Sequence, residues 1–240
     1  MTKGLATIVG GNWLLESLDE PSAARVHLYA EKIDVGAGDI VCWAGEATDH
    51  AYFPDSAILS ALTILTDGAS IETARIGREG AFGLFEAMYT HSIFGQCVCT
   101  VPGTILRVPF KILRFVFEHS PRARGVFIAY RLGLGNQIEQ AVACYASHNT
   151  LERVSRWLLA MDDRMKGKNL PFTHEFLAHL LGANRKSVTL ALQAMQASNC
   201  IIYHRGKIKI LDRPRLEKMS CECYKIMKAW TALNAPPPPP

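Results

Sequence analysis

The stretch from Thr173 to Leu211 constrains the fold of this chain more than any other. Thr173 is a favourable helix N-cap, and apolar residues follow it at helical spacing. Gly182 can adopt the positive φ that ends a helix, and Asn184 supplies a second N-cap two residues later. Because so short a connection makes two helices cross steeply, the sequence predicts a helix-turn-helix unit whose second helix projects its first turn outward.

The first turn of the second predicted helix carries groups suited to nucleic acid. Arg185 can contact guanine edges or a phosphate with its planar guanidinium, and Lys186 adds a mobile charge. Hydroxyl groups nearby can bond to bases or to the backbone. We therefore expect double-stranded DNA as a partner, with an interface formed by Thr173, Asn184, Arg185, Lys186, Ser187, Thr189, Arg205 and Lys207.

A basic hairpin is predicted behind these helices. Two apolar strands, 201–203 and 208–210, are joined through residues 204–207, the pattern of a wing in which Arg205 and Lys207 would anchor phosphates. From Phe176 to Leu211 there is no Asp or Glu, whereas there are five Lys or Arg residues. The local field therefore favours a polyanion more than the net charge of +4 suggests. The alternative is a helical packing motif with an ordinary solvated basic face.

The N-terminal half has the pattern of short β-strands separated by Gly-centred turns. The clearest pair is Ile58–Leu65 and Ser70–Ile76, and a second hairpin is predicted from Ile93–Val101 and Thr104–Val108. Regular short strands favour a β-roll or jelly roll over a parallel sheet. With 240 residues and 49% hydrophobic content, the chain can form one large or two modest domains, and we expect an α+β fold.

A long helix is predicted to open at Ser120-Pro121 and to connect the two halves. Apolar residues alternate along it in steps of three and four, which predicts a homodimer seam through Phe127, Leu134, Ile138, Ala141 and Tyr145. The alternative is that this stripe packs on its own β-roll. A terminal helix is expected over Leu216–Trp230. The predicted organisation is a sensor-like β-roll at 1–119, a dimerisation helix at 120–148, a winged helix-turn-helix domain at 149–230 and a disordered Pro-rich tail at 231–240.

A β-roll, a long helix and a C-terminal winged helix-turn-helix, in this order, resemble the Crp/Fnr family of bacterial transcription regulators. The sharpest part of the likeness runs from Thr173 to Val188, and the recognition arginine of the family falls on Arg185. Lys186 stands where an acidic base reader is common, and Leu190 where some members have an arginine, so sequence preferences do not carry over. The resemblance implies a dimeric, sequence-specific DNA-binding transcription regulator, with RNA polymerase as a further candidate partner.

The sensor half departs from the cyclic-nucleotide-binding members of this family. The segment containing Gly80, Ala81, Phe82 and Gly83 resembles their nucleotide-binding segment, but Ala81 replaces the glutamate that binds the ribose. No Arg or Lys lies between Arg78 and Arg107 to pair the cyclic phosphate. A buried phosphate without a cation is costly, so we expect a regulator that cyclic AMP does not control. The iron–sulfur members use an N-terminal cysteine cluster, and the first cysteine here is Cys42, so no cofactor is expected.

The cysteines and histidines do not predict a metal site. Seven cysteines, an odd number in a chain of this size, are expected to be reduced. Of the two C-x-C pairs, Cys97/Cys99 and Cys221/Cys223, the second would point about 200° apart on a helix, which is poor for joint binding. His174 and His179 are five residues apart, whereas a zinc-peptidase helix needs a spacing of four.

No enzymatic activity is predicted, although a site on the β-roll assembled from His50, His91 and Glu46 remains conceivable. Phosphate-binding, dinucleotide-binding and nucleophile-elbow motifs are absent from the sequence. The alternative function is a small-ligand-binding or catalytic β-roll protein with a protein-interaction module at its C-terminus. No apolar run is long enough to span a bilayer, and the first residues do not form a signal peptide, so we expect a cytoplasmic protein without a membrane partner.

Overall fold

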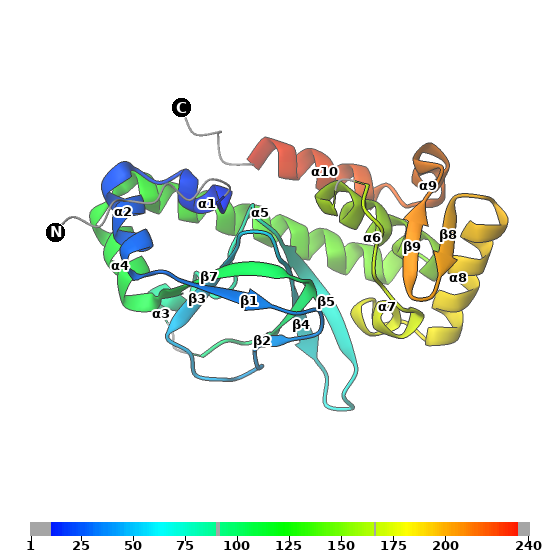
Figure 1. The fold of residues 1–240 in the computed structure, drawn as a ribbon, viewed down its shortest axis with the longest axis horizontal. Helices are drawn as coiled ribbons and strands as arrows, with labels where there is room; N and C mark the ends of the chain where they lie inside the picture. The colour runs from blue at the N-terminus through cyan, green and yellow to red at the C-terminus, as the bar shows by residue number, and fades with distance from the viewer. Residues whose placement is uncertain (1–10, 90–91, 166, 235–240) are drawn as a thin grey trace.

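The computed structural model describes residues 11–89, 92–165 and 167–234 (Figure 1). Its N-terminal half is a roll of two antiparallel sheets, with strand orders β1-β7-β3 and β2-β6-β4-β5. The strands are β1 (Glu31–Val35), β2 (Ile40–Cys42), β3 (His50–Pro54), β4 (Ile58–Ile64), β5 (Ser70–Ile76), β6 (Gln96–Val101) and β7 (Gly103–Pro109). The predicted β-roll and α+β class are therefore confirmed.

The predicted β4–β5 hairpin is confirmed, and the second predicted hairpin is wrong. β6 pairs with β2 and β4, whereas β7 pairs with β1 and β3, so the two consecutive strands lie in different sheets. Only Pro102 separates them, which is too short for a hairpin loop. A Cβ on Gly103 would lie 2.6 Å from the backbone nitrogen of Ala57, so the crossing requires glycine at this close approach.

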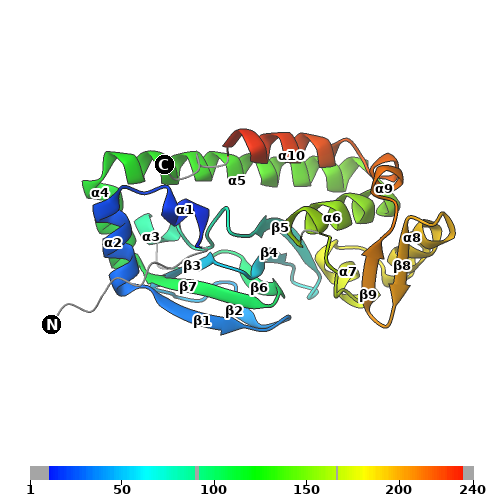
Figure 2. The ribbon, with the colours of Figure 1, turned by 45° about the horizontal axis from the view of Figure 1, so that its top comes forward.

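Helices cover one end and one side of the roll: α1 (Trp13–Glu16), α2 (Glu20–Tyr29), α3 (Glu86–Tyr89), α4 (Phe110–His119) and α5 (Pro121–Ser147). The 27-residue helix α5 runs along the roll toward the C-terminal half, as Figure 2 shows. Ser120 caps it by accepting a hydrogen bond from the backbone N–H of Ala123 at 3.0 Å. The predicted start of the long helix is thus confirmed.

Part of the stripe predicted as a dimer seam contacts the same chain, whereas Leu134 and Ile138 of that stripe are only partly buried. Phe127 and Ala141 are buried, and the Tyr145 hydroxyl donates to the carbonyl of Glu72 at 2.9 Å. The alternating three- and four-residue spacing identifies an apolar face of the helix, but it does not determine which surface packs against that face. A second set of α5 side chains remains exposed: Ile128, Leu132 and Val142, with exposed fractions of 46%, 64% and 62%.

The C-terminal half consists of α6 (Thr150–Met165), α7 (His174–Leu180), α8 (Arg185–Ala197), β8 (Ile201–His204), β9 (Lys207–Ile210), α9 (Arg213–Met219) and α10 (Cys223–Asn234). Only His148 and Asn149 separate α5 from α6. The core of this half is built on Trp157, which meets Phe172 edge to face at 4.8 Å. Both side chains are fully buried, so they fix α6 against the segment that enters α7.

The prediction of one terminal helix over Leu216–Trp230 is wrong. Ser220 has extended backbone angles, and its hydroxyl donates to the carbonyl of Glu217 at 2.8 Å, so the helix stops there. A new helix, α10, begins at Cys223 and runs beside α5 (Figure 2). α10 continues to Asn234, into the predicted tail, and residues 235–240 lie outside the described part of the chain. No helix among the described residues is both long and apolar enough to cross a membrane.

Candidate nucleic-acid interface

The two helices of the predicted DNA-reading unit begin at the predicted caps. The Thr173 hydroxyl accepts from the backbone N–H of Phe176 at 3.1 Å, and the Asn184 side chain accepts from the backbone N–H of Lys186 at 2.7 Å. Gly182, between the helices, has a φ of +52°. These local signals place α7 and α8 as the sequence predicts.

Helix α8 buries one face and projects the other. Its buried side chains are Val188, Ala191, Leu192 and Met195, which join the core beneath α6 and α7. The opposite face presents Arg185 and Lys186 to solvent in the first turn, with Ser187 partly exposed beside them. A helix N-terminus with exposed cations attracts phosphate, because the unpaired N–H groups and the macrodipole favour an anion.

Arg185 has an acidic neighbour that the sequence window did not include. Its guanidinium lies 3.2 Å from the Glu175 carboxylate of α7, and both side chains are about 70% exposed, at 69% and 71%. A surface ion pair of this kind contributes only about 0–1 kcal/mol. A phosphate or guanine edge can therefore replace Glu175 at little cost. The sequence does not predict this ion pair, because it depends on the turn geometry that brings the start of α7 next to the start of α8.

Thr189, which is predicted to contact DNA, also makes a contact inside the unit. Its hydroxyl lies 2.9 Å from Nδ1 of His174, so it braces α8 against α7. The His174 ring also contacts the ring of Tyr203, with centroids 4.4 Å apart. Burial lowers the pKa of His174, and the charge of Arg185 lowers it further. Thr189 and His174 therefore join α7, α8 and the hairpin, and the hydroxyl is already engaged within the unit.

The wing forms as predicted. His204 pairs with Lys207 across the turn, and the two residues between them, Arg205 and Gly206, have φ values of +45° and +75°. Two positive φ values match a type I′ hairpin turn. Arg205 and Lys207 are exposed, and β8, which pairs with β9, lies beside α8 (Figure 1). Cations from the wing and from the first turn of α8 therefore belong to one compact unit.

This unit is docked on the roll through β5. Leu181 forms an isolated bridge with Ile71, and the Ser70 hydroxyl donates to the carbonyl of His179 at 3.0 Å. Farther along, Arg164 of α6 donates to Glu79 at 2.6 Å. The carboxylate of Glu72 is 6% exposed and accepts from Ser60 at 2.6 Å, from the indole of Trp157 at 3.2 Å, and from Arg75. The position of the helix-turn-helix is thus fixed by polar contacts from the roll.

The degenerate nucleotide segment is packed into the protein. Ala81 is 2% exposed, and its carbonyl accepts from the Tyr130 hydroxyl of α5 at 2.8 Å. A Cβ on Gly80 would lie 2.6 Å from that same hydroxyl. Phe82 exchanges two backbone hydrogen bonds with Tyr52 of β3, each 2.9 Å long, and Gly83 follows with a φ of +79°. Tyr130 thus contacts the backbone at the position that the resemblance assigns to a ribose ligand.

Comparison with known proteins agrees with this architecture. Residues 152–219 match the family model of the Crp-like helix-turn-helix domain. The fold is similar to that of a Crp/Fnr-family transcriptional regulator from Eubacterium rectale, with 20% identity, a TM-score of 0.69 and coverage of 86% of this chain and 96% of that chain. FixK2 from Bradyrhizobium japonicum is 18% identical, with a TM-score of 0.68 and coverage of 80% and 98%.

TTHA1359, a Crp/Fnr-family regulator from Thermus thermophilus, is also 18% identical, with a TM-score of 0.67 and coverage of 79% of this chain and 98% of that one. No curated protein matches the sequence. The helix-turn-helix match covers α6 to α9, and the structural likeness extends over the roll and the long helix. Residues 152–219 therefore form a Crp-like helix-turn-helix domain, in a chain whose overall fold is that of Crp/Fnr-family regulators.

Proposed function

We propose that the protein is a dimeric, sequence-specific regulator whose α8 enters the major groove and whose wing contacts the phosphate backbone. The observation that carries this proposal is the exposed pair Arg185 and Lys186 at the start of α8, beside the exposed cations of the wing. Arg185 contacts a base edge or a phosphate, with Lys186 and Ser187 beside it. Arg205 and Lys207 anchor phosphates. Thr173 and Asn184 cap their helices and so position these groups.

The proposed dimer uses the exposed face of α5. Ile128, Leu132 and Val142 share this face with Gly135 and Glu139, in alternating steps of four and three. The large exposed side chains along it favour a second copy of α5 as the partner. Two copies related by a two-fold axis would present two α8 helices to a near-palindromic site. RNA polymerase remains a candidate partner at the regulated promoter.

The same proposal excludes cyclic AMP as the controlling signal and assigns no catalytic reaction to the roll. The space next to Ala81 is taken by Tyr130, and the nearby cations Arg75 and Arg164 are paired with Glu72 and Glu79. A cyclic phosphate at Ala81 would have to be buried without a cation. The protein would act on DNA in the cytoplasm.

The test is selection of bound fragments from genomic DNA by the purified full chain, followed by salt titrations on the selected site and on random DNA. We expect a palindromic site bound by the wild type. Arg185→Ala should lose about 1–3 kcal/mol of specific binding if Arg185 reads a base. Lys207→Ala should weaken both DNAs and reduce the salt slope by about 0.9.

The matched control is Lys111→Ala, which removes an exposed cation from α4, away from the helix-turn-helix. It should leave affinity, specificity and salt slope unchanged. Equal losses for Lys111→Ala and Lys207→Ala would show that net charge alone drives binding. Absence of DNA binding by the wild type under these conditions would overturn the proposal for the ligand-free protein.

A further inference from the structure

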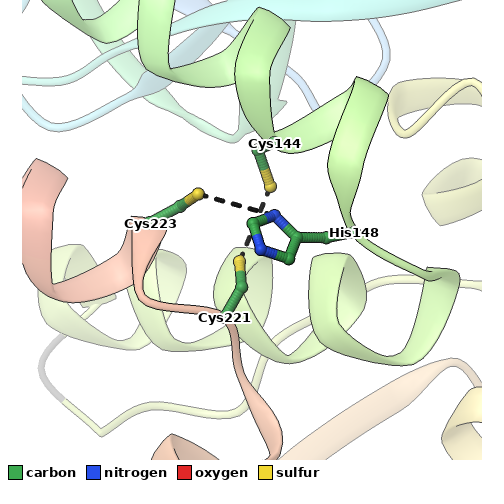
Figure 3. Close-up of side chains that lie close together, drawn as sticks. All are labelled: Cys144, His148, Cys221 and Cys223. Carbon is green, nitrogen blue, oxygen red and sulfur yellow. Dashed lines mark hydrogen bonds between the residues drawn. The ribbon is translucent and has the colours of Figure 1, made fainter.

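Four side chains with metal-ligating atoms converge where α5 ends: Cys144, His148, Cys221 and Cys223 (Figure 3). Their ligand atoms all lie within 4.8 Å of one another. The three cysteines are buried and have free thiols. His148 is largely buried, with a side-chain exposure of 15%. This group lies outside the DNA interface and outside the degenerate sensor segment.

The sequence brings these residues together in two ways. Cys144 and His148 are four residues apart at the end of α5, so they share one face of the helix. Cys221 and Cys223 follow the break at Ser220. The expectation that this pair points about 200° apart assumed a continuous helix. Because Cys221 lies before α10 and Cys223 is its first residue, both side chains turn toward α5 (Figure 3). The sequence predicts no metal site here partly because it assumes this continuous helix.

The distances fit a tetrahedral ion. Zn–S bonds of about 2.3 Å and Zn–N bonds of about 2.0–2.1 Å separate two sulfurs by about 3.8 Å, and a sulfur from a nitrogen by about 3.6 Å. The Sγ atoms of Cys144 and Cys221 are 3.6 Å apart. Sγ of Cys223 is 3.7 Å from Nδ1 of His148. These two pairs therefore have the lengths of two opposite edges of one zinc tetrahedron.

The surroundings of the cluster also fit a metal. Nε2 of His148 lies 3.2 Å from the Glu222 carboxylate, which orients the ring so that Nδ1 faces the sulfurs. The side chain of Gln140 donates to Sγ of Cys223 at 3.0 Å. Three thiolates with Zn²⁺ carry a net charge of about −1. The guanidinium of Arg156, 4% exposed, interacts electrostatically with Cys144 and Cys221 and can balance that charge.

We propose that Cys144, His148, Cys221 and Cys223 bind one zinc ion in a closed, tetrahedral Cys3His site. A closed site has no position for a substrate, so its role is structural. Two ligands precede the DNA-binding half in sequence and two follow its winged helix-turn-helix. Zinc would therefore hold the end of α5 against the turn between α9 and α10. A disulfide between Cys144 and Cys221 would use two of the four groups and give no role to the contact between His148 and Glu222.

The first measurement is the zinc content of the full chain, purified under reducing conditions from zinc-supplemented cells without a metal-affinity tag. We expect about one zinc ion per chain, measured by inductively coupled plasma mass spectrometry. Exchange with Co²⁺ should give intense visible bands and sulfur-to-cobalt charge transfer, the signature of tetrahedral thiolate ligation. Wild-type protein without zinc, or a weak octahedral cobalt spectrum, would overturn the proposal. Metal-free protein with a Cys144–Cys221 disulfide would overturn it as well.

Variants distinguish zinc binding at this site from nonspecific zinc binding by other free cysteines. Cys223→Ser should lose the metal, whereas Cys42→Ser, which changes an equally buried cysteine of the roll, should retain it. Glu222→Gln changes an exposed side chain, so it should fold normally and keep His148 as a ligand. Its zinc affinity, measured by competition with a chelator, should fall about 10–100-fold. Retention of zinc by Cys223→Ser would contradict the assigned ligand set.

Discussion

Gly182 lies so close to Ile71 that a Cβ on the glycine would stand 2.6 Å from Cγ1 of the isoleucine. Gly182 belongs to the turn of the helix-turn-helix, and Ile71 belongs to strand β5 of the roll. The glycine is therefore required twice, by its φ of +52° and by its neighbour in the other half of the chain. This contact joins the helix-turn-helix to the β-roll.

Gly182→Ala should destabilise the protein by about 2–5 kcal/mol, because a left-handed alanine costs about 1–2 kcal/mol and overpacking costs about 1–3 kcal/mol. Denaturant unfolding measures this loss. Gly68→Ala is the matched control, since Gly68 has a φ of +83° but no atom within 4 Å of its added Cβ. If the two variants lose equal stability, the contact with Ile71 contributes nothing. If the contact matters, Ile71→Ala should cost less in the Gly182→Ala background than in the wild type.

Glu175→Gln should strengthen DNA binding about 2–5-fold, because it releases Arg185 from an ion pair worth about 0–1 kcal/mol and removes a negative charge facing DNA. Fluorescence anisotropy at several salt concentrations measures the effect, which should shrink as salt rises. Glu118→Gln, an exposed change near the end of α4, should leave affinity unaltered. Weaker binding by Glu175→Gln would mean that Glu175 orients Arg185 for DNA.

Acid should weaken the contact between the roll and α6 through Glu79. Burial opposes ionisation of Glu79, but Arg164 and backbone hydrogen bonds outweigh it and hold the pKa below its ordinary value of 4.5. The unfolded chain therefore binds this proton more readily. The stability contributed by Glu79 is complete above pH 4.5 and is lost as pH falls through the lower, folded pKa.

Glu79→Gln should accordingly lose about 1.5–3 kcal/mol at pH 7 and show a shallower loss of stability in acid than the wild type. Urea unfolding across a pH series measures both. Glu31→Gln serves as the control, because its ion pair with Arg107 is exposed, and it should change stability by less than about 1 kcal/mol. If the free energy of unfolding of the wild type and of Glu79→Gln depends on pH in the same way, Glu79 does not contribute to the loss of stability in acid.

Leu132→Glu should convert the proposed dimer into monomers, because it places a charge in the exposed apolar face of α5. Sedimentation velocity and DNA binding to a palindromic site should change together. Leu28→Glu makes the same substitution at a side chain of α2 that is 76% exposed, and it should leave the association state unaltered. If Leu132→Glu sediments with the same mass as a wild-type dimer, the dimer interface does not include this face of α5.

The parts predicted correctly depend on local chemistry. Caps at Thr173 and Asn184, the positive φ of Gly182 and the turn at Arg205-Gly206 each act within a few residues, so they are readable in the sequence. Which face of α5 is buried depends on how the helix packs against the roll. The spacing of apolar residues along the helix carries no information about that packing. The ion pair of Glu175 with Arg185 depends on how α7 crosses α8.

The cysteine cluster was missed for a different reason. Its ligands lie in two segments far apart in sequence, and the second segment is usable only because the helix breaks at Ser220. The break follows from the hydrogen bond between Ser220 and Glu217, against apolar spacing that favours a continuous helix. Pro102, similarly, joins two strands that long-range pairing places in separate sheets.

The connection of α5 to α6 through His148 and Asn149 alone limits how the protein can respond to any signal. Two residues supply about four soft backbone dihedrals, too few to let the DNA-binding half slide away while both helices stay intact. The freedom that this link leaves is rotation about a pivot, and such a rotation would have to break the contacts that hold the helix-turn-helix on β5. In the proposed dimer, a small change of angle at this pivot would alter the spacing of the two α8 helices by much more than it moves the pivot itself.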